Sequence, residues 1–252
     1  MIDNPDNLPI GSLIKSIKTE YGGQYIDALR NETQITTNAA IFKRPITNMN
    51  GKTIIPLTIA PLHEHNLVFP SMEHHELVVW VSMLTPCNPK LFGNIYYLET
   101  PDRQHLFSVS HEFATLQTHF LNDFKNKIIR GVNSFKLPFN HPTYLIYFWG
   151  FDKSKVTNIT LNLNGHAYYN GPIEPLEHQK VLRGLNVEPT FIFFSQDPFH
   201  KQIKSSINFS RIDSIDLLIT TEQEEQTDFH VAAINLQGYR CLNGMFGLVY
   251  SK

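Results

Sequence analysis

The amino-acid sequence predicts an all-β chain of the sandwich or barrel type, with a single helix. Three observations support this fold class. Short runs of β-branched and aromatic residues recur along the chain, and 15 Pro and 13 Gly residues separate them. Residues 157–164 alternate apolar and polar side chains with the period of two that a half-buried strand requires. Only residues 101–124 carry apolar side chains at helical spacing.

The predicted strands are of two kinds. The alternating strand 157–164 ends at Asn164-Gly165, a dipeptide that accepts the positive φ of a tight turn, and 215–219 alternates in the same way. The other strands are short, continuously apolar runs, as expected for strands that are buried on both faces. These runs are 76–83, 144–149, 190–194 and 247–250.

One segment has the spacing of an amphipathic helix. Its apolar residues follow one another at intervals of 3, 4, 3, 4 and 4: Leu106, Val109, Phe113, Leu116, Phe120 and Phe124. Thr100-Pro101 before them suits an N-cap followed by proline in the first turn. The sequence therefore predicts a helix over 101–124 that links two β regions. No internal repeat is visible in the sequence.

Composition limits the classes of protein that remain. A chain of 252 residues and 29.0 kDa is long enough for one large domain or two modest ones. Charged residues make up 17%, and the net charge of −2 gives nucleic-acid binding through a basic face no support. The N-terminus lacks a signal-peptide pattern, and no apolar run approaches the length that spans a bilayer. We therefore expect a soluble chain made in the cytosol.

Histidines are the strongest candidates for a metal site. On an extended strand His63 and His65 point the same way, which is the spacing of two ligands in a cupin-type site. His74 and His75 are adjacent, so at most one of them can join such a site, and His75 would complete it. No later Glu and His follow in the cupin context. Polar residues at a strand end and its loop are the favoured interpretation, and the metal site is the alternative.

Other catalytic patterns are incomplete. His111-Glu112 resembles the opening of the zinc motif H-E-x-x-H, but Thr115 stands where the second His belongs. Neither a nucleophile elbow nor a glycine-rich phosphate loop occurs. Cys241 and His230 can be drawn as a pair, yet nothing marks Cys241 as exposed, and we expect both cysteines to be free, buried thiols. The residues thus predict no catalytic, cofactor-binding or metal site.

Ten short segments stand out when they are taken in chain order. They are YGGQYID at 21–27, IPL at 55–57, LVFP at 67–70, HEL at 75–77, YLET at 97–100, SHEF at 110–113, FNHP at 139–142, LNGH at 163–166, SINFSRID at 206–213 and GMFGLVYS at 244–251. In this order they resemble the C-terminal portion of the major capsid protein of nucleocytoplasmic large DNA viruses. The last two are the most specific. Their common order along most of the chain carries the resemblance more than any single motif does.

This resemblance implies a jelly roll, and two jelly rolls side by side in one chain. In that family three chains form a capsomer, and capsomers tile an icosahedral shell around DNA and an inner membrane. The implied role is structural, without enzymatic activity, with partners in the chain itself and in minor capsid proteins. No specific nucleic acid and no membrane insertion are implied, and the implied location is the virion after synthesis in the host cytoplasm. Asn208, Ser210 and Arg211 are expected to fix a loop by hydrogen bonds to backbone.

One departure from the family shapes the expected domains. Only the second jelly roll looks complete, at 113–252, whereas 1–112 matches the later strands of the first jelly roll and the start of the linking helix. We expect subunit contacts or outer surface at strand edges of 190–219 and at the loop 170–175. A shortened major capsid protein is the first hypothesis. A minor capsid jelly roll, or a metal-binding jelly-roll enzyme or lectin that uses His63, His65 and His75, are the alternatives.

Overall fold

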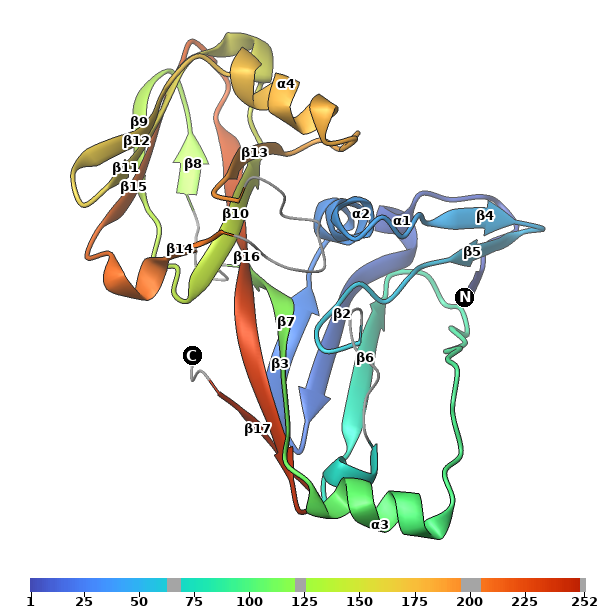
Figure 1. Ribbon diagram of the computed structural model, residues 1–252. Coiled ribbons are helices and arrows are strands. Elements are labelled where there is room, and N and C mark those ends of the chain that lie inside the picture. Colours follow the sequence, from blue (N-terminus) through green and yellow to red (C-terminus); the bar gives the residue numbers. More distant parts are fainter. Residues whose placement is uncertain (63–68, 121–125, 196–204, 250–252) are drawn as a thin grey trace. The chain divides into compact units, whose positions relative to one another are not determined.

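The computed structural model describes residues 1–62, 69–120, 126–195 and 205–249 (Figure 1). The chain divides into two compact units. Unit 1 comprises Met1–Thr118 and Gln237–Lys252, and unit 2 comprises His119–Leu236. No helix in the described ranges is both long and apolar enough to cross a membrane.

Unit 1 is built from short helices and antiparallel strands. Its helices are α1 (Ile10–Leu13), α2 (Glu32–Ile41) and α3 (Thr100–Ser108), with a 3-10 turn η1 (Phe69–Met72). Its strands are β1 (Ile2–Asp3), β2 (Ile14–Tyr21), β3 (Gln24–Leu29), β4 (Thr47–Met49), β5 (Lys52–Ile54), β6 (Leu77–Met83) and β17 (Met245–Leu248). Two longer strands, β7 (His111–Phe120) and β16 (Thr227–Leu242), run from one unit into the other.

Six strands of unit 1 form two small sheets, one ordered β3-β2-β6 and the other β1-β5-β4, whereas β17 pairs with β16. The hairpin between β2 and β3 turns at Gly22-Gly23, and both glycines adopt a positive φ. A side chain at Gly22 would meet the ring of His75 at 2.8 Å, so only glycine fits this turn. Ile17 and Leu29 are buried in the core beneath the first sheet.

Unit 2 contains one α-helix, α4 (Glu174–Leu182), and two 3-10 turns, η2 (Lys153–Lys155) and η3 (Phe209–Arg211). Its strands are β8 (Asn126–Ile128), β9 (Gly131–Lys136), β10 (Pro142–Trp149), β11 (Val156–Leu163), β12 (His166–Gly171), β13 (Thr190–Phe193), β14 (Ile207–Asn208) and β15 (Ile215–Thr221).

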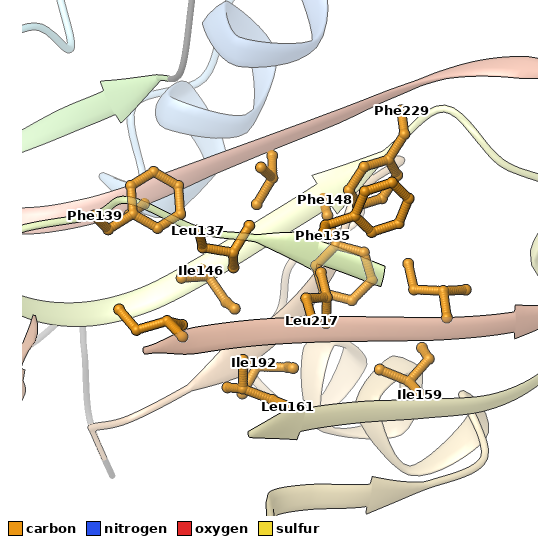
Figure 2. Close-up of a cluster of buried hydrophobic side chains, with 14 of the residues drawn as sticks. Phe135, Leu137, Phe139, Ile146, Phe148, Ile159, Leu161, Ile192, Leu217 and Phe229 are labelled. Atoms are coloured by element: carbon orange, nitrogen blue, oxygen red, sulfur yellow. The ribbon is translucent and has the colours of Figure 1, made fainter. Parts of the chain in front are cut away.

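Unit 2 is a sandwich of two antiparallel sheets, which is the jelly-roll arrangement. One sheet has the order β12-β11-β15-β9, and the other runs β13-β10-β16, with β8 paired to β16 and β14 paired to β10. The core lies between the sheets and contains side chains from both, including Phe135, Leu161 and Leu217 from one and Ile146 and Phe229 from the other (Figure 2).

The two alternating runs and the apolar runs 144–149 and 190–194 became strands of this sandwich. The apolar runs 76–83 and 247–250 belong to unit 1 instead, and the prediction that 76–83 is buried on both faces is wrong, because side chains of β6 are only partly buried or exposed. Ile159 and Leu161 are fully buried on the inner face of β11, as the period of two predicts. Residues 144–149 lie in β10, where nearly every side chain is buried on one face or the other. The predicted turn at Asn164-Gly165 is confirmed, with φ angles of 50° and 79°.

The predicted helix over 101–124 is wrong for most of its length. Helix α3 ends at Ser108, and His111–Phe120 form strand β7, which pairs with β16. None of the residues of α3 is buried, so this helix does not pack an apolar face against a core. In β7 Leu116 is buried by pairing within a sheet, because tertiary contacts override the local periodicity. Residues 121–124 lie outside the described ranges.

Three helices were not predicted: the four-residue α1 and the longer α2 and α4. The two longer ones each carry a local signal. In α2 the side chain of Asn31 accepts a hydrogen bond from the backbone N–H of Gln34 at 2.9 Å, which is an N-cap. Helix α4 has proline in its first turn, at Pro175. Asn31 and Pro175 are therefore the sequence signals that could have located these helices.

Candidate interaction surface

The candidate metal ligands do not form a site in the part of the chain that the structure describes. His63 and His65 lie outside the described residues. The ring of His75 packs edge-on against Tyr21 with centroids 5.6 Å apart, and its Nδ1 atom accepts a hydrogen bond from the N–H of Phe246 at 3.5 Å. No group of three His, Cys, Asp or Glu side chains among the described residues could hold a metal ion. The absence of a metal site stays a prediction.

The zinc-motif and thiol candidates have other partners. His111 contacts the carbonyl oxygen of Leu106 through Nε2 at 2.9 Å, and Glu112 forms an ion pair with Arg240 at 2.6 Å. Both residues lie in a strand, so the helical spacing of a zinc motif does not arise. Cys241 is buried, and burial raises the pKa of its thiol to about 11, which is the opposite of an activated nucleophile.

An apolar segment between β6 and α3 is exposed. It comprises residues 91–98 and is called the 91–98 segment below. Its six large apolar side chains are exposed by 42–93%: Leu91, Phe92, Ile95, Tyr96, Tyr97 and Leu98. The segment lies outside helices and strands (Figure 1). Its sequence, LFGNIYYL, contains no charged residue. Isolated apolar residues are common on protein surfaces, but six within eight positions mark a surface that associates.

Both ends of the 91–98 segment are attached to unit 1. Lys90 exchanges two hydrogen bonds with Met1, each 2.8 Å long, from one backbone N–H and from the N-terminal ammonium group. At the other end α3 begins at Thr100 and its Leu106 carbonyl accepts a hydrogen bond from the Ser71 hydroxyl. The exposed side chains are therefore presented by a stretch of chain that is held at both ends.

A second exposed aromatic residue lies on β6. The Trp80 side chain is 54% exposed, and its Nε1–H donates a hydrogen bond to Glu20 Oε2 at 2.8 Å. Lys18 forms an ion pair with Glu20 at 2.5 Å and lies 5.9 Å from the centre of the indole ring. Hydrogen bonds from Lys18 and then Trp80 hold the pKa of Glu20 below its ordinary value. These contacts fix the orientation of an exposed indole on the outer face of the sheet.

The other predicted contact regions are only partly accessible. Residues 190–193 form β13 and are buried, while 196–204 lie outside the described residues. In the loop 170–175 the Asn170 side chain bonds to Asn158 and Thr160, each at 3.0 Å. A role of these regions in subunit contacts stays a prediction.

The sheets of the two units define the fold class of this protein. The two-sheet sandwich of unit 2 and the three-stranded sheet β3-β2-β6 of unit 1 are the parts of a double jelly roll. The structure is similar to PBCV-1 VP54 as fitted into a cryo-EM reconstruction of the virophage Sputnik, with a TM-score of 0.71 and 15% identity over 97% of this chain and 85% of that chain. It is also similar to the quasi-atomic model of the PBCV-1 virus capsid, with a TM-score of 0.67 and 16% identity over the same shares.

The sequence comparison agrees with the fold. A curated relative is the major capsid protein of Pyramimonas orientalis virus, which is 24% identical over 319 residues that cover 95% of this chain and 77% of the relative. No family model matches the chain. The predicted double jelly-roll fold and the predicted resemblance to the major capsid proteins of large DNA viruses are confirmed, and with them a structural role in a capsid.

Proposed function

We propose that this chain is a shell-building protein that self-associates as homotrimers, and that the trimers tile an icosahedral capsid. The similarity to the capsid protein of Pyramimonas orientalis virus along 95% of the chain carries the proposal. Two features of the chain support self-association. The 91–98 segment exposes uncharged apolar surface, and the charged share of 17% is below the roughly 25% of average soluble domains.

The proposal also covers the domains of the subunit, its partners and its location. The jelly rolls correspond to 1–112, which is incomplete, and to 113–252. The role needs no catalytic residue, cofactor or metal, and the partners beyond other copies are minor capsid proteins rather than nucleic acid or a membrane. The site of action is the virion, after synthesis in the host cytoplasm. An accessory capsid jelly roll is the alternative.

The solution mass of the purified chain tests the proposal. Light scattering coupled to size exclusion is expected to give three times 29.0 kDa. A stable monomer at all concentrations contradicts the shell-building role and favours the accessory protein. Metal analysis of protein purified without chelators addresses the remaining alternative, because a site at His63, His65 and His75 would hold about one equivalent.

A variant tests whether the 91–98 segment forms the contact between copies of the chain. Replacing Phe92, Ile95 and Tyr97 with serine is expected to lower the mass to that of a monomer, since these side chains are exposed by 68%, 69% and 93% and contribute little to folding. The matched control replaces Val181 and Leu182 in α4, which are exposed by 67% and 72%. The control is expected to remain a trimer with an unchanged melting temperature.

A further inference from the structure

The two units repeat one succession of elements. In unit 1 the eight-residue β2 turns through two residues into the six-residue β3, and α2 begins after two further residues. In unit 2 the strands β11 and β12 have the same lengths, with the same two-residue turn, and α4 again begins after two residues. A seven-residue strand then returns to pair with the first strand, β6 with β2 and β15 with β11.

The repeat extends to irregularities in strand register, which fall at equivalent positions in the two units. The pairing of β2 with β6 shifts after Ile14, and the pairing of β11 with β15 shifts after Val156, in each case the first residue of the strand. The hairpin pairing shifts after Thr19 in β2 and after Leu161 in β11, in each case the sixth residue. By this register Leu77–Met83 of β6 correspond one to one with Ile215–Thr221 of β15.

The two sheets differ at one edge. In unit 2 the far edge of β15 is covered by β9, which pairs along the strand from Gly131 to Lys136. In unit 1 the described residues contain no strand in the equivalent place, and β6 ends the sheet.

Burial follows this difference in strand number. Leu217 and Ile219 on the inner face of β15 are fully buried, while their counterparts Val79 and Val81 on β6 are only partly buried. Among the described residues, β6 therefore pairs along one side only, and its inner apolar side chains are less buried than those of β15.

The charge of the β6 edge limits what can pair with it. β6 has the sequence LVVWVSM and carries no charged residue. On the neighbouring strand Lys18 and Glu20 neutralise one another. An added strand thus gains main-chain hydrogen bonds and apolar contact without needing a charge of either sign, and a charged residue opposite Val79 or Val81 would be buried without a partner.

We propose that the free edge of β6 binds one antiparallel β-strand donated by a different polypeptide, in the place that β9 holds in unit 2. The donor strand is about six residues long, as β9 is, and uncharged at its inward positions. Its apolar residue lies opposite Val79, as Phe135 lies opposite Leu217 in unit 2. The inference rests on the internal repeat and does not depend on the proposed trimer.

Trp80 reports occupation of this edge. Of the two tryptophans, Trp80 is 54% exposed and Trp149 only 5%, so iodide quenches mainly Trp80. The probe is a synthetic peptide with the sequence of residues 130–139, which contains β9, added to the intact chain. We expect reduced iodide quenching and roughly tenfold slower amide exchange in residues 77–83. The control peptide carries Ser134→Pro, which breaks strand pairing, and is expected to have no effect.

Three outcomes would overturn the proposal. The first is unchanged quenching and exchange at β6. The second is equal protection of β12, an exposed edge strand of unit 2 that serves as the internal control, because the peptide would then bind any edge. The third concerns the chain without peptide, in which amide exchange at β6 is already slow and the chain is a dimer. If dilution dissociates that dimer and removes the protection of β6, a second copy of the chain occupies the edge.

Discussion

At the scale of single residues, Asn164 joins two loops of unit 2. Its backbone has the left-handed φ of 50°, and its Oδ1 atom accepts hydrogen bonds from the backbone N–H groups of Asp213 at 2.8 Å and Ser214 at 3.0 Å. The LNGH motif therefore holds the end of the SINFSRID motif. The residues that carried the family resemblance here hold two loops of the fold together.

A second pair of motifs meets in the same way. The Asn208 side chain accepts a hydrogen bond from the N–H of Ser210 at 3.1 Å, and the Ser210 hydroxyl accepts one from the N–H of His141 at 2.8 Å. The FNHP motif is thus fastened to SINFSRID. The expected loop-fixing role is confirmed for Asn208 and Ser210, and for Arg211 it stays a prediction.

Replacing Asn164 with alanine is expected to lower the free energy of unfolding by about 1–3 kcal/mol, because two side-chain hydrogen bonds and a residue tolerant of positive φ are lost together. Urea unfolding followed by circular dichroism measures the change. Asn162→Ala, two positions earlier on β11, is the control, with an expected change within about 0.5 kcal/mol. Equal losses in the two variants would contradict the role of Asn164.

The thiols give a second prediction at this scale. Both thiols are free, as predicted, but the prediction that both are buried is wrong for Cys87, which is partly exposed. Cys241 is buried, and burial raises its pKa to about 11. We expect iodoacetamide at pH 8 to modify Cys87 and to leave Cys241 unmodified until the chain is unfolded in denaturant. Peptide mass spectrometry identifies the modified residue. Modification of Cys241 in the native protein at a comparable rate would show that the thiol is accessible.

At the scale of elements, a small polar network attaches α4 to unit 2. Glu177 of α4 lies 2.9 Å from the Lys153 ammonium and 2.5 Å from that of Lys180, and it accepts a hydrogen bond from the Thr190 hydroxyl at 2.6 Å. Burial alone would raise the pKa of Glu177, but hydrogen bonds from Lys180, Thr190 and Lys153 outweigh it and hold that pKa below 4.5. One carboxylate thus compensates two ammonium groups.

Glu177→Gln is expected to destabilise the protein by about 1–3 kcal/mol at pH 7, because Lys153 and Lys180 then face one another without a carboxylate. The pKa of Glu177 is lower in the folded state, so its contribution is complete above pH 4.5 and is lost as pH falls through the folded value. The difference between wild type and variant should therefore shrink towards pH 3. Urea unfolding at both pH values measures it.

Glu174→Gln on the exposed side of the same helix is the control for this variant. It is expected to change stability by less than about 0.5 kcal/mol at either pH. A difference between wild type and Glu177→Gln that stays constant from pH 7 to pH 3 would mean that the carboxylate charge is not what attaches α4.

At the scale of the whole molecule, the low charge of the chain bears on how copies associate. The net charge is −2, and the exposed 91–98 segment carries no charge. Association through such a surface is driven by apolar burial rather than by ion pairs. We expect the mass of the proposed trimer to be unchanged when salt is raised from about 0.1 M to about 1 M, a range in which ionic contacts are strongly screened. Dissociation at high salt, seen by light scattering, would point to ion pairs.

Local sequence patterns predicted several parts of this protein correctly. The alternation in 157–164, the turn at Asn164-Gly165 and the apolar run of β10 each depend on side chains that are close in sequence, and the structure confirms them. The family resemblance rested on the order of short motifs and did not need their contacts. The sequence alone thus determined an all-β chain, its jelly-roll class and its relation to capsid proteins.

Only the tertiary structure decided which strands are partners. The spacing from Val109 to Phe120 suits a helix, but β7 gains its hydrogen bonds from β16, more than a hundred residues later. The repeat of hairpin, helix and strand in the two units is also invisible in the residues, since it lies in element lengths and register. The free edge of β6 follows from that repeat. Pairing joins distant segments, and a local pattern records polarity along one segment only, so the open edge could be recognised only after the fold was known.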